Sequence, residues 1–118
     1  MNINKMIQTQ NQKIVTAISS IAQIEINLKD KKAEIANDEI EMTKQEGYER
    51  AKTELERQRQ LENYTPTRFK EQRNLERELI NWNGQLDIAK QEGYMVDRLL
   101  KLMELLPEHQ RFDFVSEE

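Results

Sequence analysis

The one histidine of the chain is where metal or acid–base chemistry would have to be sought. His109 follows Pro107, and Glu104 and Glu108 lie nearby in sequence. A zinc or di-iron site built on helices needs two to four converging ligands, commonly from Glu-x-x-His motifs on facing helices. One histidine and no cysteine do not supply such a set. We therefore expect neither a metal site nor a bound cofactor.

Nucleophilic catalysis is not indicated either. A serine nucleophile needs a neighbouring base, most often a histidine, but Ser19 and Ser20 have none nearby, and Ser116 lies close to the C-terminus. The three glycines are isolated, so there is no glycine-rich phosphate-binding loop. Carboxylate pairs such as Glu39 and Glu41 are unavoidable among 22 acidic residues. The expected protein is not an enzyme.

A basic and aromatic cluster suggests one alternative function, nucleic-acid binding. Basic residues gather around Tyr64 and Phe69, namely Arg57, Arg59, Arg68, Lys70, Arg73 and Arg77. Such a cluster can bind phosphates and stack bases. Six glutamates occupy the same stretch, and the net charge of -4 gives no long-range attraction to a polyanion or to anionic lipid. We keep contact through Arg68, Lys70, Arg73 and Arg77 as the alternative, and favour a salt-bridged, exposed tip.

Composition indicates long helices as the elements that would carry these residues. Of the 118 residues, 34% are charged and only 36% hydrophobic, while glycine and proline together number five. Disorder is disfavoured because isoleucine and leucine recur at regular spacing. No secretory signal is visible, and no apolar run approaches the roughly 20 residues of a membrane span. A cytoplasmic protein is expected.

A seven-residue repeat dominates the N-terminal half and predicts a coiled coil. Its a positions are Ile7, Ile14, Ile21, Leu28, Ile35 and Met42, and its d positions are Ile3, Gln10, Ala17, Ile24, Lys31, Asp38 and Gln45. The pattern predicts one helix over about residues 4–63, with a local bend at Gly47. The polar d residues Lys31 and Asp38 either set the register by meeting charges from a second helix or lie where the seam is partly open.

A turn and a second helix follow. Thr65 can cap a helix whose first residue is Pro66, with Tyr64 and Phe69 placed for a hydrophobic staple. The second helix is predicted over about residues 66–106 and ends before Pro107, leaving residues 107–118 as a tail. Its seam alternates spacings of four and three through Ala89 and Gly93, and its large members are Leu75, Leu79, Trp82, Leu86, Val96, Leu100 and Met103.

These elements predict an all-α protein, a long antiparallel helical hairpin or coiled coil formed by residues 1–106. A turn at residues 64–65 would place Met42 opposite Leu86 and Leu28 opposite Leu100. The alternative fold is a three-helix bundle with a break near Asn37, in which the first 36 residues fold back on the hairpin.

In the hairpin, the second helix runs out of residues near Ile24 and leaves an apolar face uncovered. This face consists of Ile3, Met6, Ile7, Ile14, Val15, Ile18 and Ile21. Burial of each large side chain is worth ~1.5–3 kcal/mol, so a homo-oligomer or a protein partner is expected to cover it. The predicted function is a protein–protein interaction module: a scaffold, assembly factor, chaperone or inhibitor.

Known helical hairpins offer a comparison of plan. The expected architecture resembles that of prefoldin-type and secretion-type chaperones, although no sequence for the prefoldin β-hairpin lies between the helices, so no functional residues carry over. A small accessory protein of a bacterial virus or of a secretion machine would fit the same plan.

Overall fold

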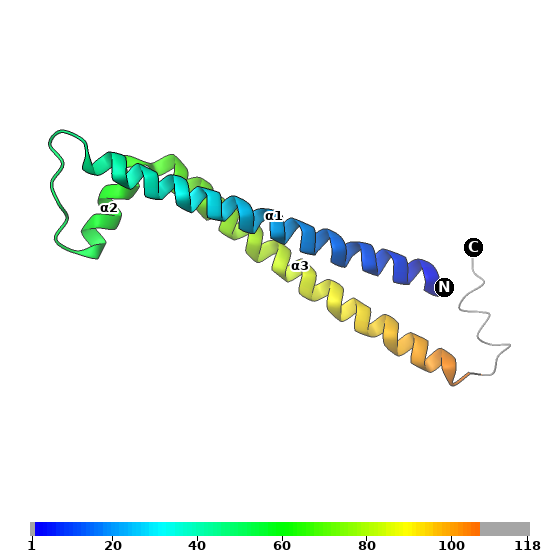
Figure 1. The fold of residues 1–118 in the computed structure, drawn as a ribbon. Coiled ribbons are helices and arrows are strands. Elements are labelled where there is room, and N and C mark those ends of the chain that lie inside the picture. The colour runs from blue at the N-terminus through cyan, green and yellow to red at the C-terminus, as the bar shows by residue number, and fades with distance from the viewer. Residues whose placement is uncertain (1, 107–118) are drawn as a thin grey trace. The chain divides into compact units, whose positions relative to one another are not determined.

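The computed structural model describes residues 2–106, so His109, Ser116 and the predicted tail lie outside the described residues. It contains three helices, α1 (Ile3–Thr43), α2 (Glu54–Tyr64) and α3 (Pro66–Glu104), and no strand within residues 2–106 (Figure 1). The prediction of an all-α fold is confirmed. None of the described helices combines the length and apolar character needed to cross a membrane.

Side-chain caps explain where α1 and α2 begin. The Asn2 Oδ1 atom accepts a hydrogen bond from the Lys5 main-chain N–H at 3.0 Å and caps α1. Thr53 caps α2, because its hydroxyl accepts from the Glu56 N–H at 3.1 Å. The Glu56 carboxylate reaches back to the Lys52 N–H at 2.9 Å. This arrangement is close to a capping box and fixes the start of a separate helix.

The predicted turn at the Thr65–Pro66 step is confirmed. α2 ends at Tyr64 and α3 starts at Pro66, so Thr65 alone separates the two helices. Proline suits the first helical position because that residue's N–H would have no helical partner. The Thr65 hydroxyl does not cap α3 but donates to the Asp38 carboxylate at 2.8 Å.

The prediction of one continuous helix over residues 4–63 is wrong. α1 ends at Thr43, and residues 44–53 connect it to α2. Within this connection Gly47 adopts a φ of 83°, a left-handed conformation that an α-helix does not contain and that glycine accepts without steric cost. The alternative break near Asn37 is also wrong, because that residue lies within α1; three helices form, but the break comes later.

The structure divides into two compact units, each containing parts of α1 and α3. The first combines residues up to 21 with those from 81, and the second comprises residues 22–80. In the first unit, α1 and α3 run antiparallel (Figure 1): residues near Asn2 meet Leu99, whereas Thr16 lies near Trp82. Its buried centre consists of Ile3, Gln10, Ala17, Ala89 and Val96.

In the second unit, α2 packs beside the end of α1 and the start of α3. Leu61 of α2 forms a buried cluster with Ile35 and Met42, and Tyr48 and Phe69 pack against it. The connection is held as well, since the Gln60 side-chain amide donates to the Glu49 carbonyl at 2.9 Å. Residues 44–64 therefore pack against the C-terminal end of α1 and the start of α3, and they do not extend α1.

The predicted pairing between the two long helices is corrected as a result. Leu28 was expected opposite Leu100, yet Lys31, one turn further along α1, bonds to Glu71. Residues 44–64 fold back beside α1, so α3 begins next to the C-terminal end of α1. The later residues of α3 then lie beside the first residues of α1. Residues 3–21 therefore have an intrachain partner, which the predicted pairing did not give them.

The buried line along α1 changes heptad position within the second unit. In the first unit the buried residues occupy d positions, Ile3, Gln10 and Ala17, and Ile24 continues this line. The buried residues that follow occupy a positions, namely Leu28, Ile35 and Met42. A helix with 3.6 residues per turn drifts by about 20° per heptad relative to a strict seven-residue repeat. The d positions therefore rotate away from α3 while the a positions rotate toward it.

Candidate protein-interaction site

A line of apolar residues on α1 remains accessible in the first unit although α3 packs beside it. We call this line the α1 ridge and define it as Ile7, Ile14, Val15, Ile18 and Ile21. Val15 is 62% exposed and Ile18 is 52% exposed, while the other three are half-buried. The ridge exists because the drift of the helix places d residues at the centre of the contact with α3, and leaves the a residues of this segment at its edge.

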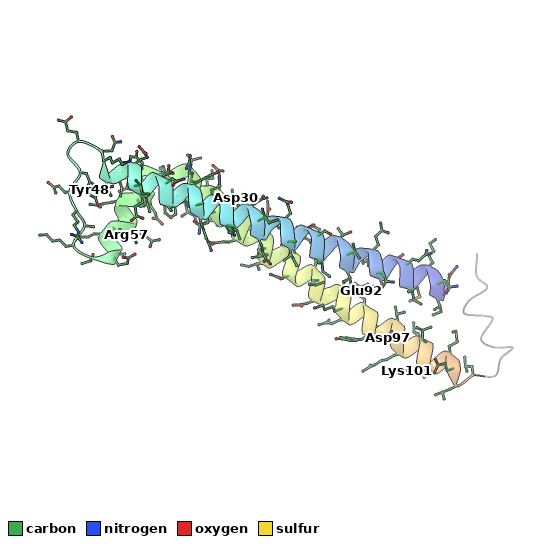
Figure 2. The ribbon with its side chains drawn as sticks, in the orientation of Figure 1. Asp30, Tyr48, Arg57, Glu92, Asp97 and Lys101 are labelled. Atoms are coloured by element: carbon green, nitrogen blue, oxygen red, sulfur yellow. The ribbon has the colours of Figure 1, made fainter. Side chains whose placement is uncertain are left out.

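A groove runs between the α1 ridge and α3. On the α1 side it is lined by Ile7, Gln10, Asn11 and Ile14, and on the α3 side by Lys90, Gly93, Tyr94, Val96 and Asp97. Figure 2 labels Asp97 on α3. The α3 wall is polar at its rim, where Tyr94 is 66% exposed. The groove thus joins an isoleucine wall to a charged and aromatic one, a surface suited to an amphipathic partner.

The seven residues predicted to contact a partner do not form a single uncovered face. Ile3 is buried in the first unit, with 2% of its surface exposed. Met6 is half-buried and lines a different groove, beside Lys13 and Met95. The remaining five are the α1 ridge. The predicted set therefore includes Ile3, which the contact with α3 buries, and Met6, which lies on the other side of that contact from the α1 ridge.

The predicted seam of α3 behaves more uniformly. Val96 is buried, and Leu75, Leu79, Trp82, Leu86, Leu100 and Met103 are all half-buried. Ala89 is buried as well, and its carbonyl accepts a hydrogen bond from the Gln10 side-chain amide. Gly93 faces Gln10, and a Cβ atom there would lie 3.8 Å from the Gln10 Cγ atom, an ordinary van der Waals contact. Small residues at the centre of the seam bring the two backbones together.

The basic residues proposed for the alternative site are divided between two roles. Arg68 bonds to α1, because its Nη1 atom donates to the Asp38 carboxylate and to the Glu34 carbonyl, each at 3.0 Å. Arg57 of α2, labelled in Figure 2, forms an ion pair with Glu39 at 2.6 Å. The others, Lys70, Arg73 and Arg77, are exposed.

The aromatic residues of the alternative site are also divided. Phe69 packs on the buried cluster of the second unit and is half-buried, whereas Tyr64 is 41% exposed. Base stacking needs an accessible aromatic face. Of the two residues, Tyr64 is the more exposed.

A second polar cluster joins α1 to α3 in the second unit. The Lys31 Nζ atom donates to Glu71 at 2.7 Å and to Glu34 at 2.9 Å. The hydrogen bond to Glu71, followed by that to Glu34, raises the pKa of Lys31, and the bond from Lys31 lowers the pKa of Glu34. Of the two interpretations of the polar d residues, the structure agrees with contact to charges of the second helix, with arginine rather than lysine opposite Asp38.

Known proteins supply no further guidance on these sites. Within residues 2–106, no group of three or more acidic, histidine or cysteine residues is arranged to hold a metal ion. A scan against protein-family models, a search of curated proteins and a search of solved structures each gave no match. Any function must therefore be argued from the surfaces themselves.

Proposed function

We propose that this protein is a non-enzymatic protein–protein interaction module that buries the α1 ridge against a second copy of the chain or against a partner protein. The observation that carries the proposal is the exposure of Val15 and Ile18 beside the half-buried Ile7, Ile14 and Ile21. Five large aliphatic residues on one helix face form a contiguous apolar surface. Surfaces of this kind on soluble proteins commonly mark contacts with other proteins.

The energetics support contact with a helix. The ridge repeats at helical spacing, so a partner helix can lie along it and pack side chains between its residues. Burial of an exposed aliphatic side chain contributes ~1.5–3 kcal/mol before the costs of association are subtracted. Two exposed and three half-buried aliphatic residues would give a contact of moderate strength. Such a contact is consistent with a role as scaffold, assembly factor, chaperone or inhibitor.

The test replaces exposed ridge residues without touching the contact with α3. Val15→Asp with Ile18→Asp should leave helicity and the melting transition nearly unchanged, because both side chains point to solvent. The same pair should abolish self-association measured by light scattering, or partner retention in affinity purification, because two charges would be desolvated in the contact. Ala17→Asp is the matched control, since Ala17 is 1% exposed and its replacement should unfold the first unit.

Two results would contradict the proposal. One is a wild-type chain that stays monomeric and retains no partner. The other is an assembly that survives Val15→Asp with Ile18→Asp unchanged. Either outcome would mean that the ridge is an ordinary exposed surface.

The alternative function is contact with a nucleic-acid backbone through Lys70, Arg73 and Arg77. These residues follow one another at spacings of three and four, so they share a face of α3. Against it, Arg68 is already engaged by Asp38, and the chain has a net charge of -4. Binding to oligonucleotides at ~0.1 M salt should therefore be no tighter than non-specific binding. Submicromolar affinity lost on Arg73→Ala with Arg77→Ala would favour the alternative.

A further inference from the structure

The C-terminal half of α3 carries a second apolar seam, which the function proposed above does not use. Its residues are Ile88, Glu92, Met95, Leu99 and Leu102, separated by spacings of four and three in alternation. This repeats the pattern of the seam that packs on α1, shifted by one residue to the neighbouring face. We call Ile88, Met95, Leu99 and Leu102 the α3 ridge. Three of the four are largely exposed, at 57%, 65% and 58% for Ile88, Met95 and Leu102.

A groove separates the α3 ridge from α1. Thr9, Lys13 and Glu92 line its middle. One half continues to Trp82, Gln85 and Ile88, and the other to Met6, Met95 and Leu99. This groove lies on the other side of the buried Gln10 from the groove beside the α1 ridge, because Thr9 and Lys13 line the former and Asn11 and Ile14 line the latter. The two surfaces are therefore distinct.

The spacing of the α3 ridge identifies the secondary structure of its ligand. Apolar residues alternating at three and four keep one stripe facing a neighbouring helix, because the repeat matches 3.5 residues per turn. A helix that carries two such stripes can pack against two helical neighbours. In the first unit, α1 covers one stripe, and the accessible stripe can pack a further helix along the groove.

The charges around the groove indicate which kind of helix fits. Glu92 is the only carboxylate among the lining residues, and Lys13 engages it at 3.2 Å. Lys5 lies on the α1 wall, and Arg98 sits one turn from Met95 and from Leu102 on α3. Both are exposed, and neither forms an ion pair within residues 2–106. The α1 edge is cationic, and on the α3 edge Arg98 is accompanied by the exposed Asp87 beside Ile88. The end of the groove near Lys5 and Arg98 therefore favours an amphipathic helix with acidic flanks.

We propose that the α3 ridge and its groove bind an acidic amphipathic α-helix of another protein. A second copy of this chain fits the surface less well. If two copies of this face met across a two-fold axis, each would offer Glu92 as its one lining carboxylate, and Lys13 of the same chain already engages it. The proposal does not depend on the α1 ridge, which lies on the opposite side of Gln10.

A displayed peptide library tests this proposal. The library holds helical peptides of about three heptads, in which the a and d positions vary among apolar and polar residues and the flanking positions vary among Glu, Lys and Gln. Selection on the full chain should enrich apolar a and d positions with Glu at the flanks. The control chain carries Ile88→Ser with Met95→Ser, two exposed positions at which serine leaves the fold intact, and it should enrich no such peptides.

Charge reversal sharpens the test. Lys5→Glu with Arg98→Glu should weaken the best Glu-flanked peptide by about tenfold and shift the selection toward Lys flanks. Val15→Asp with Ile18→Asp should leave peptide affinity unchanged, which separates this surface from that of the proposed function. Enrichment without a preference for Glu, or equal enrichment on the serine control, would overturn the proposal. So would a wild-type dimer that Ile88→Ser with Met95→Ser converts to a monomer, because the surface would then belong to self-association.

Discussion

Lys31 of α1 and Glu71 of α3 are joined by a hydrogen bond of 2.7 Å, and this contact records the register of the helices in the second unit. The Lys31 side chain is only 15% exposed, so its ammonium group lies close to the helix contact although Glu71 reaches it from the surface. A polar residue at a coiled-coil position favours the alignment that satisfies it over alignments that do not. Lys31 therefore helps to select the observed pairing.

The same contact predicts how stability depends on pH. The raised pKa of Lys31 gives stability that is complete below its unfolded pKa of about 10.4 and is lost as the pH rises through the folded value. The lowered pKa of Glu34 gives stability that is complete above its unfolded pKa of about 4.3 and is lost as the pH falls through the folded value. Lys31→Met should therefore lower the unfolding midpoint most between these limits.

Urea unfolding followed by circular dichroism at a series of pH values measures this effect. The difference between the wild type and Lys31→Met should shrink below about pH 4 and above about pH 10.4. Lys32→Met is the control, because Lys32 is exposed and forms no ion pair within residues 2–106. A difference that stays constant across the whole range would show that Lys31 acts through its aliphatic stem alone.

Two glycines in identical pentapeptides are predicted to respond in opposite ways to alanine. Lys-Gln-Glu-Gly-Tyr occurs at residues 44–48, where Gly47 has a φ of 83°, and again at 90–94, within α3. Gly47→Ala should destabilise by ~1–2 kcal/mol, because a left-handed conformation strains an L-residue. Gly93→Ala should stabilise by up to about 1 kcal/mol, because alanine is the better helix former and its Cβ atom meets only Gln10 at 3.8 Å.

Chemical unfolding of both variants under the same conditions provides the comparison. If Gly47→Ala were neutral or stabilising, residues 44–53 would be able to join α1 and α2 into one helix, and helicity would rise. That result would restore the continuous helix predicted from the heptad repeat.

The N-cap of α2 gives a third prediction. Thr53→Ala removes the hydroxyl that accepts from the Glu56 N–H and should cost about 1 kcal/mol. Thr53→Asn should recover most of the loss, because asparagine also caps helices well. The loss should appear in the cooperative unfolding transition, since Leu61 of the same helix belongs to the buried cluster of the second unit. Equal stability of all three proteins would mean that α2 does not depend on its cap.

These positions show what the sequence determines and where the reasoning from it failed. The turn at Thr65–Pro66 and the α3 seam were predictable from proline at the first helical position and from apolar periodicity, although the Thr65 hydroxyl bonds to Asp38 and does not cap α3. The start of α2 was missed, although Thr53 and Glu56 have the spacing of a capping box. The continuous heptad pattern was given more weight than the single glycine at position 47. Local sequence alone does not decide between helix and turn here, because the same five residues are helical at 90–94, where α3 packs on α1.

The candidate surfaces were predictable in part for a related reason. The a positions of the repeat contain Ile7, Ile14 and Ile21, so the apolar character of the α1 ridge is evident from spacing. Its accessibility is not, because it depends on which residues of α3 lie opposite, and that pairing depends on how many residues the connection and α2 consume. The α3 ridge has the same spacing signal, shifted by one residue from the first seam.

The last prediction concerns Gln10, the buried polar residue at the centre of the first unit. Its side-chain amide donates to the Ala89 carbonyl, which already serves the backbone of α3, so loss of the bond leaves no unpaired carbonyl. Gln10→Leu should therefore raise the unfolding free energy by about 1 kcal/mol, because a net hydrogen bond is worth less than a well-packed aliphatic group there. Gln10→Ala should lower it by ~1–3 kcal/mol, because it leaves a cavity between the helices. Gln8→Leu, at an exposed position of the same helix, is the control.

If Gln10→Leu destabilised as much as Gln10→Ala, the hydrogen bond itself would be the main contribution of Gln10. A stabilised Gln10→Leu variant whose amide resonances double in NMR spectra would show instead that Gln10 secures a single register at a cost in stability.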